Sequence, residues 1–366
     1  MCRGACSSPP PEMTMQRAAA SLCLALAAGQ SVASLDNMRA ARIHSAITKE
    51  DTSGVYVDNI PMGTPGKGEV LIEVHTSSVN PVDWKLAEQG LYITPSQLGA
   101  DVSGVVVGVG TGCSRLQVND EVWSDVGYSG LLPGAHGNGA WAEYVTVAEE
   151  IVSKKPTSLP HSMAGALPLV ALTAYQSMVT AGAPWDPNSN ISVVITSGDG
   201  GTGSLGVQLA KKMGAQSVRS CAAPDHLSYV ADLGADVVVD FTQADVFDGV
   251  PDDSIDVVFD NYGANGTAQI AMNALRTGGW YVFLAGGTGP GICEEPACTP
   301  KDGVNQLSLW TDSSGHDDLD AIAAIADSQG LTVNVDSSYA LEDSADAMAR
   351  QMSGQTEGKV TIEVIA

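Results

Sequence analysis

Short apolar runs alternate with amphipathic segments along the second half of the chain. Five runs rich in valine, isoleucine and phenylalanine predict strands, at residues 193–195, 217–221, 236–240, 255–260 and 279–284. Continuous apolar strands separated by helical patterns are typical of a parallel sheet that is covered on both faces. The sequence therefore predicts a doubly wound α/β domain over residues 161–303, with helices at 163–181 and 267–276 among those that cover the sheet.

The first half of the chain has a different pattern, in which short strands follow one another between turns. Strands are expected at residues 39–44, 55–57, 69–77, 102–108 and 141–147. Turns containing glycine and proline separate these strands. The pattern predicts a β-rich domain over residues 38–160, and the change to helical periodicity near 156–160 marks its boundary.

The last part of the chain, residues 304–366, mixes helices and strands. Its pattern predicts helices at 319–328 and 342–352 and strands at 331–335 and 360–365. We expect these strands to return to the first domain. Such a path leaves a cleft between the two domains, a place where ligands often bind.

A glycine-rich segment directly follows the first strand of the α/β domain. Gly198, Gly200 and Gly203 match the G-x-G-x-x-G pattern, and an amphipathic helix follows them. Glycines allow a sharp turn and a close approach of the backbone to a pyrophosphate, and a helix N-terminus favours bound anions. The strand, loop and helix in this order predict a dinucleotide site; a glycine loop that only connects two elements is the alternative.

Acidic residues outnumber basic ones by 42 to 17, which gives a formal net charge of -25. This charge repels polyanions and argues against nucleic acids and acidic membrane surfaces as partners. A hydrophobic content of 44% with 16% charged residues is typical of a globular enzyme. After residue 40, no run has the ~20 apolar residues that a membrane span needs, so the mature chain is expected to lack an integral membrane segment.

The N-terminal residues 1–37 have the pattern of a removable targeting segment. Arg17 precedes an apolar run at 18–29, and small residues at 31–33 suit a cleavage site. This pattern predicts delivery to the secretory pathway or to an organelle. An untranslated or frayed extension is the alternative, and translation from Met38 would give a cytoplasmic protein.

Seven cysteines lack the paired spacing of a zinc finger or zinc ribbon. Cys293 and Cys298 lie close together in a loop rich in glycine and proline. Two free thiols are favoured here over a local disulfide.

Eight motifs between residues 38 and 366 follow one another in a characteristic order. They are SVNPVDWKL (78–86), LGADVSGVV (98–106), NDEVW (119–123), GAWAEYV (139–145), ALPLVALTAYQ (166–176), GGTGSLGVQLAK (200–211), LGAD (233–236) and GKVTIEV (358–364). Together they resemble the zinc-independent quinone oxidoreductase branch of the medium-chain dehydrogenase/reductase superfamily. The similar subgroup includes chloroplast quinone oxidoreductase-like, alkenal reductase-like and reticulon-4-interacting-protein-like reductases.

The resemblance implies a GroES-like β-barrel catalytic domain with an inserted Rossmann domain, and NADPH bound between them. It also implies hydride transfer to a small-molecule quinone or to the β-carbon of an α,β-unsaturated carbonyl, while a homodimer is left open. Zinc-dependent relatives have cysteine where this chain has Asn80, and Gly-His-Glu where it has residues 99–101. Because neither a thiolate nor an imidazole stands at these positions, no metal is expected.

The resemblance also assigns cofactor-binding residues. Asn80 and Thr173 are expected beside the nicotinamide, where their side chains would orient the ring. The residues expected to hold the pyrophosphate are Gly198, Gly200, Gly201, Thr202 and Gly203. Those expected to border the nicotinamide half are Asn261, Tyr262, Ala285 and Gly286. The structural alternatives are a turn at Asn80, a backbone-bonded hydroxyl at Thr173 and ordinary loops at the strand ends.

Two positions depart from the pattern of the family: the first concerns phosphate binding, and the second, at the end of the second strand, concerns the choice of nucleotide. Asp199 lies inside the phosphate loop, so its carboxylate must point to solvent or weaken the binding of a phosphate. The end of the second strand, at Ala222, lacks the carboxylate that usually binds the ribose of NAD. Arg219 and His226 are the basic residues nearby. The sequence therefore favours NADP(H) over NAD(H).

The sequence contains no evident general acid. Tyr92, Asp83 and Lys85 are the nearest candidates by position, and each also suits a structural role. Asp101 is expected in the barrel wall and Lys359 at the start of the closing strand. Because solvent can protonate the oxyanion formed from a quinone or enone, we expect a metal-free NAD(P)H-dependent reductase of such compounds. A 2-enoyl thioester reductase and a non-catalytic NADPH-binding protein are the alternatives.

Overall fold

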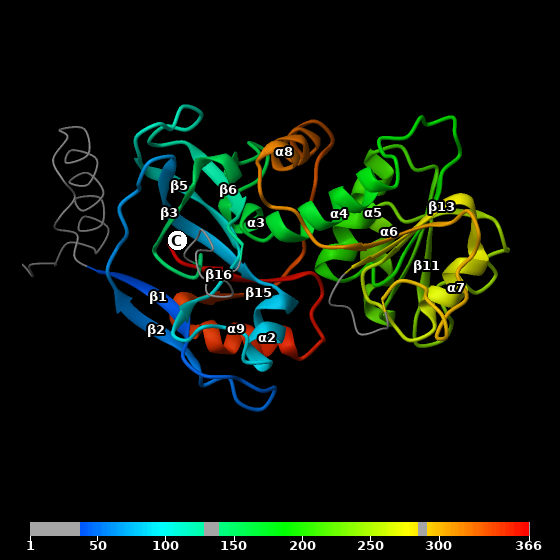
Figure 1. The fold of residues 1–366 in the computed structure, drawn as a ribbon, viewed down its shortest axis with the longest axis horizontal. Helices are drawn as coiled ribbons and strands as arrows, with labels where there is room; N and C mark the ends of the chain where they lie inside the picture. The colour runs from blue at the N-terminus through cyan, green and yellow to red at the C-terminus, as the bar shows by residue number, and fades with distance from the viewer. Residues whose placement is uncertain (1–36, 128–138, 285–290, 366) are drawn as a thin grey trace, which may run out of the picture.

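The computed structural model describes residues 37–127, 139–284 and 291–365, which form two lobes side by side (Figure 1). One lobe is built mainly on antiparallel strands and the other on a parallel sheet. Residues 1–36 of the expected targeting segment lie outside the described residues. Within the described part, none of the helices is both long and apolar enough to span a membrane.

The first lobe contains two sheets. Its larger sheet has the order β15-β16-β3-β5-β6-β8 with β7 beside β3, and the smaller one has the order β2-β1-β4. The strands are β1 (Met38–Ile43), β2 (Val55–Ile60), β3 (Glu69–Val79), β4 (Ser96–Gln97), β5 (Asp101–Val109), β6 (Glu121–Asp125), β7 (Tyr144–Ala148), β8 (Ser153–Lys154), β15 (Val335–Ala340) and β16 (Lys359–Glu363). Strands β3 and β5 pack so closely that a Cβ on Gly104 would lie 2.0 Å from the Glu73 carbonyl oxygen.

The chain returns to this lobe at its C-terminal end, as expected. Strand β16 pairs antiparallel with β3, and β15 pairs parallel with β16. The strand predicted at 331–335 is wrong, because β15 begins only at Val335. The backbone of Thr332 instead exchanges two hydrogen bonds with the carboxamide of Gln208, at 2.9 and 3.0 Å, which takes the place of strand pairing.

The second lobe is a six-stranded parallel sheet with the order β11-β10-β9-β12-β13-β14. Its strands are β9 (Ser192–Ile195), β10 (Ser217–Ala222), β11 (Val237–Asp240), β12 (Ile255–Asp260), β13 (Leu275–Leu284) and β14 (Asn305–Leu309). Val193 and Ile195 pack into one apolar cluster and Val194 into another, so both faces of the sheet are covered. The order is that of a Rossmann fold, and β14 carries the sheet beyond residue 303.

Helices lie in both lobes. They are α2 (Pro81–Glu88), α3 (His161–Ala164), α4 (Pro168–Thr180), α5 (Gly201–Lys212), α6 (Leu227–Asp232), α7 (Thr267–Ala274), α8 (Asp317–Gln329) and α9 (Ser344–Met352), with short 3-10 turns at Glu149–Ile151, Pro224–His226 and Leu341–Asp343. Of these, α2 and α9 lie in the first lobe (Figure 1). The single helix expected at 163–181 is divided into α3 and α4. Gly165 separates them, and its backbone lies so close to β3 that a Cβ would meet the Thr76 carbonyl oxygen at 2.4 Å.

Two local expectations need correction. The turn given as the structural alternative at Asn80 is instead the start of helix α2: Asn80 is its N-cap, Pro81 is its first residue, and the Asp83 carboxylate accepts the Asn80 N–H at 2.7 Å. Cys293 and Cys298 form a disulfide, although free thiols were favoured. Both sulfurs are buried in an apolar cluster beneath the loop, an environment that a polar loop sequence does not reveal.

Candidate functional site

The glycine loop joins β9 to α5 and lies against the end of β10. A Cβ on Gly203 would lie 1.9 Å from the Ser197 carbonyl oxygen, and one on Gly198 would lie 2.2 Å from the Ser220 hydroxyl. Only glycine fits at these two positions. At Gly200, by contrast, a Cβ would meet nothing closer than 3.4 Å. Helix α5 begins at Gly201, within the glycine motif, so its N-terminal N–H groups and the positive end of its dipole face the loop.

A second group of predicted residues lies at the same edge of the sheet. Asn261 and Tyr262 follow β12, the neighbour of β9 at the point where the strand order reverses. The Thr196 hydroxyl ties the two strand ends together, because it donates to Asp260 Oδ1 at 2.9 Å and accepts the Asn261 N–H at 3.0 Å. Ligands of open α/β sheets bind at such a reversal point. Ala285 and Gly286 lie outside the described residues.

The Asp199 carboxylate does not point to solvent, which was one of the two outcomes expected from the sequence. Asp199 is 8% exposed, and its Oδ2 accepts the backbone N–H of Ala223 at 2.9 Å. The same oxygen lies 3.0 Å from His226 Nδ1. The carboxylate therefore lies at the end of β10, beside Ala222.

A buried polar cluster lies at the facing edge of the first lobe. Asn80 donates from Nδ2 to Asp101 Oδ2 at 2.8 Å and accepts a hydrogen bond from Lys359 Nζ. Lys359 Nζ is also 3.4 Å from Asp101 Oδ2. Asp101 accepts two further hydrogen bonds, from the Ser78 hydroxyl and from the Leu169 N–H at the start of α4. All three residues at the centre are at most 3% exposed.

Burial dominates the electrostatics of this cluster. It raises the pKa of Asp83 and that of Asp125 to about 7, and the negative charge of Asp101 adds to both shifts. Burial lowers the pKa of Lys359, although the carboxylates around it oppose that shift. A single buried lysine thus faces several carboxyl groups, and sequence reasoning had assigned it only to the start of a strand.

Lys359 and Gly358 connect this cluster to the glycine loop. The Gly358 N–H donates to the Asp199 carbonyl oxygen at 3.0 Å, and Gly358 forms an isolated parallel bridge with Gly200. The aliphatic part of Lys359 lies against the first residue of α5, where a Cβ on Gly201 would be 2.8 Å from Lys359 Cδ. The start of β16 therefore joins the two predicted halves of the site.

Thr173 lies on α4, between the lobes. Its hydroxyl donates to the Leu169 carbonyl oxygen and is 2.7 Å from the Thr311 hydroxyl, and the residue is 3% exposed. The backbone-bonded alternative thus describes its hydrogen bond, and the carboxamide of Asn80 is similarly engaged on both sides. These contacts fix the orientation of both side chains.

The three candidate catalytic residues lie in different environments. Tyr92 is buried in the apolar core of the first lobe, and its hydroxyl has no hydrogen-bond partner among the described residues. Burial raises the pKa of Tyr92, and the Asp83 charge adds to the shift. Burial lowers the pKa of Lys85, whose ammonium lies 5.7 Å from the centre of the Trp84 ring. Asp83 lies in the first turn of α2, where its carboxylate accepts the backbone N–H of Asn80.

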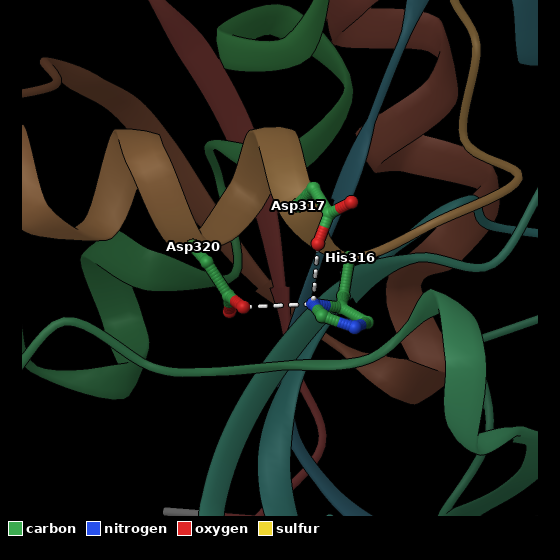
Figure 2. A group of neighbouring side chains, drawn as sticks. All are labelled: His316, Asp317 and Asp320. Atoms are coloured by element: carbon green, nitrogen blue, oxygen red, sulfur yellow. Dashed lines mark hydrogen bonds and ion pairs between the residues drawn. The ribbon is translucent and has the colours of Figure 1, made fainter.

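One group of side chains has the composition of a metal site (Figure 2). His316, Asp317 and Asp320 lie at the N-terminus of α8, where His316 Nδ1 is 2.7 Å from Asp320 and 3.4 Å from Asp317. Asp320 also accepts a hydrogen bond from Ser153. Asp317 is almost fully exposed, and acidic residues are common in the first turn of a helix. An ion-paired helix start accounts for this group.

The comparisons with known proteins identify the family. The alcohol dehydrogenase GroES-like domain model matches residues 66–157, and the zinc-binding dehydrogenase model matches residues 233–362. A 2-methylene-furan-3-one reductase of Solanum lycopersicum is 31% identical over 312 residues, which cover 84% of this chain and 74% of the relative. The chain belongs to the medium-chain dehydrogenase/reductase superfamily.

Other relatives in this superfamily have related names. The NADPH-dependent alkenal/one oxidoreductase of Arabidopsis thaliana chloroplasts is 34% identical, over 72% of this chain and 69% of the relative. The mitochondrial NAD(P)H oxidoreductase RTN4IP1 of Mus musculus is 29% identical, over 81% of this chain and 82% of the relative. A solved NAD-dependent alcohol dehydrogenase has 26% identity and a TM-score of 0.75, with 90% of this chain and 100% of that chain covered. The two-lobed fold predicted from the sequence is confirmed.

Proposed function

We propose that this protein is an NAD(P)H-dependent oxidoreductase that delivers hydride to a quinone or to the β-carbon of an α,β-unsaturated carbonyl. One observation carries the proposal: the glycine loop at the reversal point of the Rossmann sheet is joined, through Gly358 and Lys359, to the buried polar cluster of the barrel lobe. The names of the tomato and Arabidopsis relatives, a reductase of a methylene-furanone and an alkenal/one oxidoreductase, support the substrate class.

The residues present fit a dinucleotide. The loop at Gly198 and Gly203 leaves no room for side chains, so its backbone can approach a pyrophosphate, and the N-terminus of α5 favours the negative charge. When bound, the nicotinamide supplies the hydride. Asn80 and Thr173 would border the ring from the two lobes. Their existing hydrogen bonds hold both side chains in place, so they can keep the nicotinamide ring oriented for hydride transfer.

We propose that the reaction needs no zinc ion. Asn80 and Ala100 stand where zinc-dependent relatives have a cysteine and a histidine. Here Asn80 and the neighbouring Asp101 bind each other and the ammonium of Lys359. A carboxamide and one carboxylate beside a fixed cation do not match the thiolate and imidazole ligands that zinc prefers. These residues do not fit a zinc ion. The ammonium of Lys359 is the positive charge that this cluster contains.

The proposal is tested by following the absorbance of NADH and NADPH at 340 nm with purified protein and a panel of simple quinones and 2-alkenals. We expect oxidation of at least one nucleotide with members of the panel, unchanged after dialysis against a zinc chelator. Binding of nucleotide without turnover of any acceptor would instead favour a non-catalytic protein. Delivery of the protein to the secretory pathway or an organelle by residues 1–37, and a homodimer, stay predictions.

A further inference from the structure

The end of β10 is the part of a Rossmann fold that distinguishes NAD from NADP. An acidic side chain there binds the ribose 2′-hydroxyl of NAD, whereas basic side chains accept the 2′-phosphate of NADP. Here β10 ends at Ala222 without a charged side chain. The structure nevertheless places a carboxylate at this position, because Asp199 reaches across from the glycine loop and accepts the backbone N–H of Ala223.

The basic side chains near this strand are already engaged. Arg219 donates to the carbonyl oxygens of Val246 and Asp248, at 2.5 and 2.7 Å. His226 lies between two carboxylates, with Nδ1 3.0 Å from Asp199 and Nε2 3.2 Å from Glu357. Even a protonated imidazole leaves these three side chains with a net negative charge.

Two more acidic residues lie near the end of β10, one in the following turn and one on the neighbouring strand. Asp225 is exposed in the turn that follows β10, and Asp240 ends the neighbouring strand β11 opposite Ala222. A 2′-phosphate would add about two negative charges to this acidic environment. A ribose 2′-hydroxyl would instead find an acceptor, because Asp199 Oδ1 receives no hydrogen bond from the described residues.

We infer that Asp199 is the residue that selects the nucleotide, and that it makes this chain prefer NADH over NADPH. The carboxylate takes the role that an acid at the end of the strand has in NAD-dependent Rossmann folds, but it comes from the glycine loop. The inference rests on the proposed function. It departs from the preference for NADP(H) favoured by the sequence, which used the missing acid of β10 but related Asp199 only to phosphate binding.

Equilibrium binding tests the inference without catalysis. Dissociation constants for NADH and NADPH are measured by the fluorescence of the reduced nicotinamide, and those for 5′-ADP and 2′,5′-ADP by calorimetry. The variant D199N keeps the size of the side chain and an acceptor for the Ala223 N–H but removes the charge. D225N is the matched control, because it removes one charge from an exposed neighbour.

For the wild type we expect at least tenfold tighter binding of NADH than of NADPH, and the same order for the two ADP probes. D199N should strengthen NADPH and 2′,5′-ADP binding at least fivefold and change NADH binding less, whereas D225N should change either ratio less than twofold. Equal or tighter binding of NADPH by the wild type, or an unchanged ratio in D199N, would overturn the inference and leave the proposed function intact. Failure of both NADH and NADPH to bind would overturn both.

Discussion

The buried ion pair between Lys359 and Asp101 allows a quantitative test of the polar cluster. The substitution Lys359→Met removes the ammonium but keeps an unbranched chain against Gly201, so packing at the glycine loop changes little. The carboxylate of Asp101 stays behind at 0% exposure. Breaking one partner of a buried pair leaves an uncompensated charge, which is more costly than losing the pair as a whole.

The magnitude follows from the geometry. Charges 3.4 Å apart attract each other by about 5 kcal/mol at an effective dielectric constant of about 20. Asp101 keeps three donors, from Ser78, Asn80 and Leu169, which continue to stabilise the carboxylate. We therefore expect K359M to lower the free energy of unfolding by about 3 kcal/mol, at the lower end of the range for broken buried pairs.

Urea denaturation of the protein without nucleotide measures this change. Lys154 provides the control, because its ammonium is 3.1 Å from Asp120 but its side chain is 61% exposed, and K154M should cost less than about 1 kcal/mol. The double variant K359M/D101N should recover part of the loss, since it removes the stranded charge. If K359M folds and its free energy of unfolding is within about 1 kcal/mol of that of the wild type, this account of the cluster is refuted.

Three further predictions concern the loop, a buried histidine and the disulfide. Gly203→Ala should cost about 3 kcal/mol or more in urea denaturation, because its Cβ would collide with the Ser197 backbone, whereas G200A should stay within about 1 kcal/mol of the wild type. Burial, with the adjacent His75, lowers the pKa of His161 to about 4. Because the unfolded chain binds this proton at a higher pH, the free energy of unfolding should fall by about 2 kcal/mol between about pH 6.5 and about pH 4. H161Q should reduce this dependence of the free energy of unfolding on pH. C298S should lower stability by about 2 kcal/mol, as expected for a short loop, and mass spectrometry of unreduced wild type after alkylation should find the pair of cysteines unmodified.

The elements that the sequence predicted well are those fixed by local pattern. The apolar runs around Val193 and Val257 alternate between the two faces of the Rossmann sheet, which explains why a continuous run marks a buried parallel strand. The glycine spacing also predicted the loop correctly, because Gly198 and Gly203 are packed against residues of the same β9-α5-β10-α6 segment, namely Ser197, Ser220 and Val230. The strand expected at 331–335 failed, since its hydrogen bonds go to the side chain of Gln208, 124 residues away.

Long-range contacts also explain what sequence reasoning missed in the candidate site. Asn80 and Lys359 are 279 residues apart, and no local pattern shows that an ordinary Gly-Lys pair at the start of a strand ends in a buried cluster. In β16 the first four residues, from Lys359 to Ile362, are buried, and a lysine in such a position needs a buried partner. The acids of the other motifs include Asp101 in LGADVSGVV, and the structure shows that this one is the ion-pair partner of Lys359.

The position of the Asp199 carboxylate decides whether this residue weakens phosphate binding or selects between the two nucleotides. As a carboxylate among phosphate-binding glycines, it argued from the sequence for weak phosphate binding or a solvent-facing side chain. In the structure it lies at the end of β10, where its Oδ2 accepts the Ala223 N–H and is 3.0 Å from His226 Nδ1. The charge therefore lies at the place expected for the ribose and not at the place expected for the pyrophosphate. In this position it can favour one nucleotide over the other, while the backbone N–H groups and the helix dipole stay available for the diphosphate that both nucleotides share.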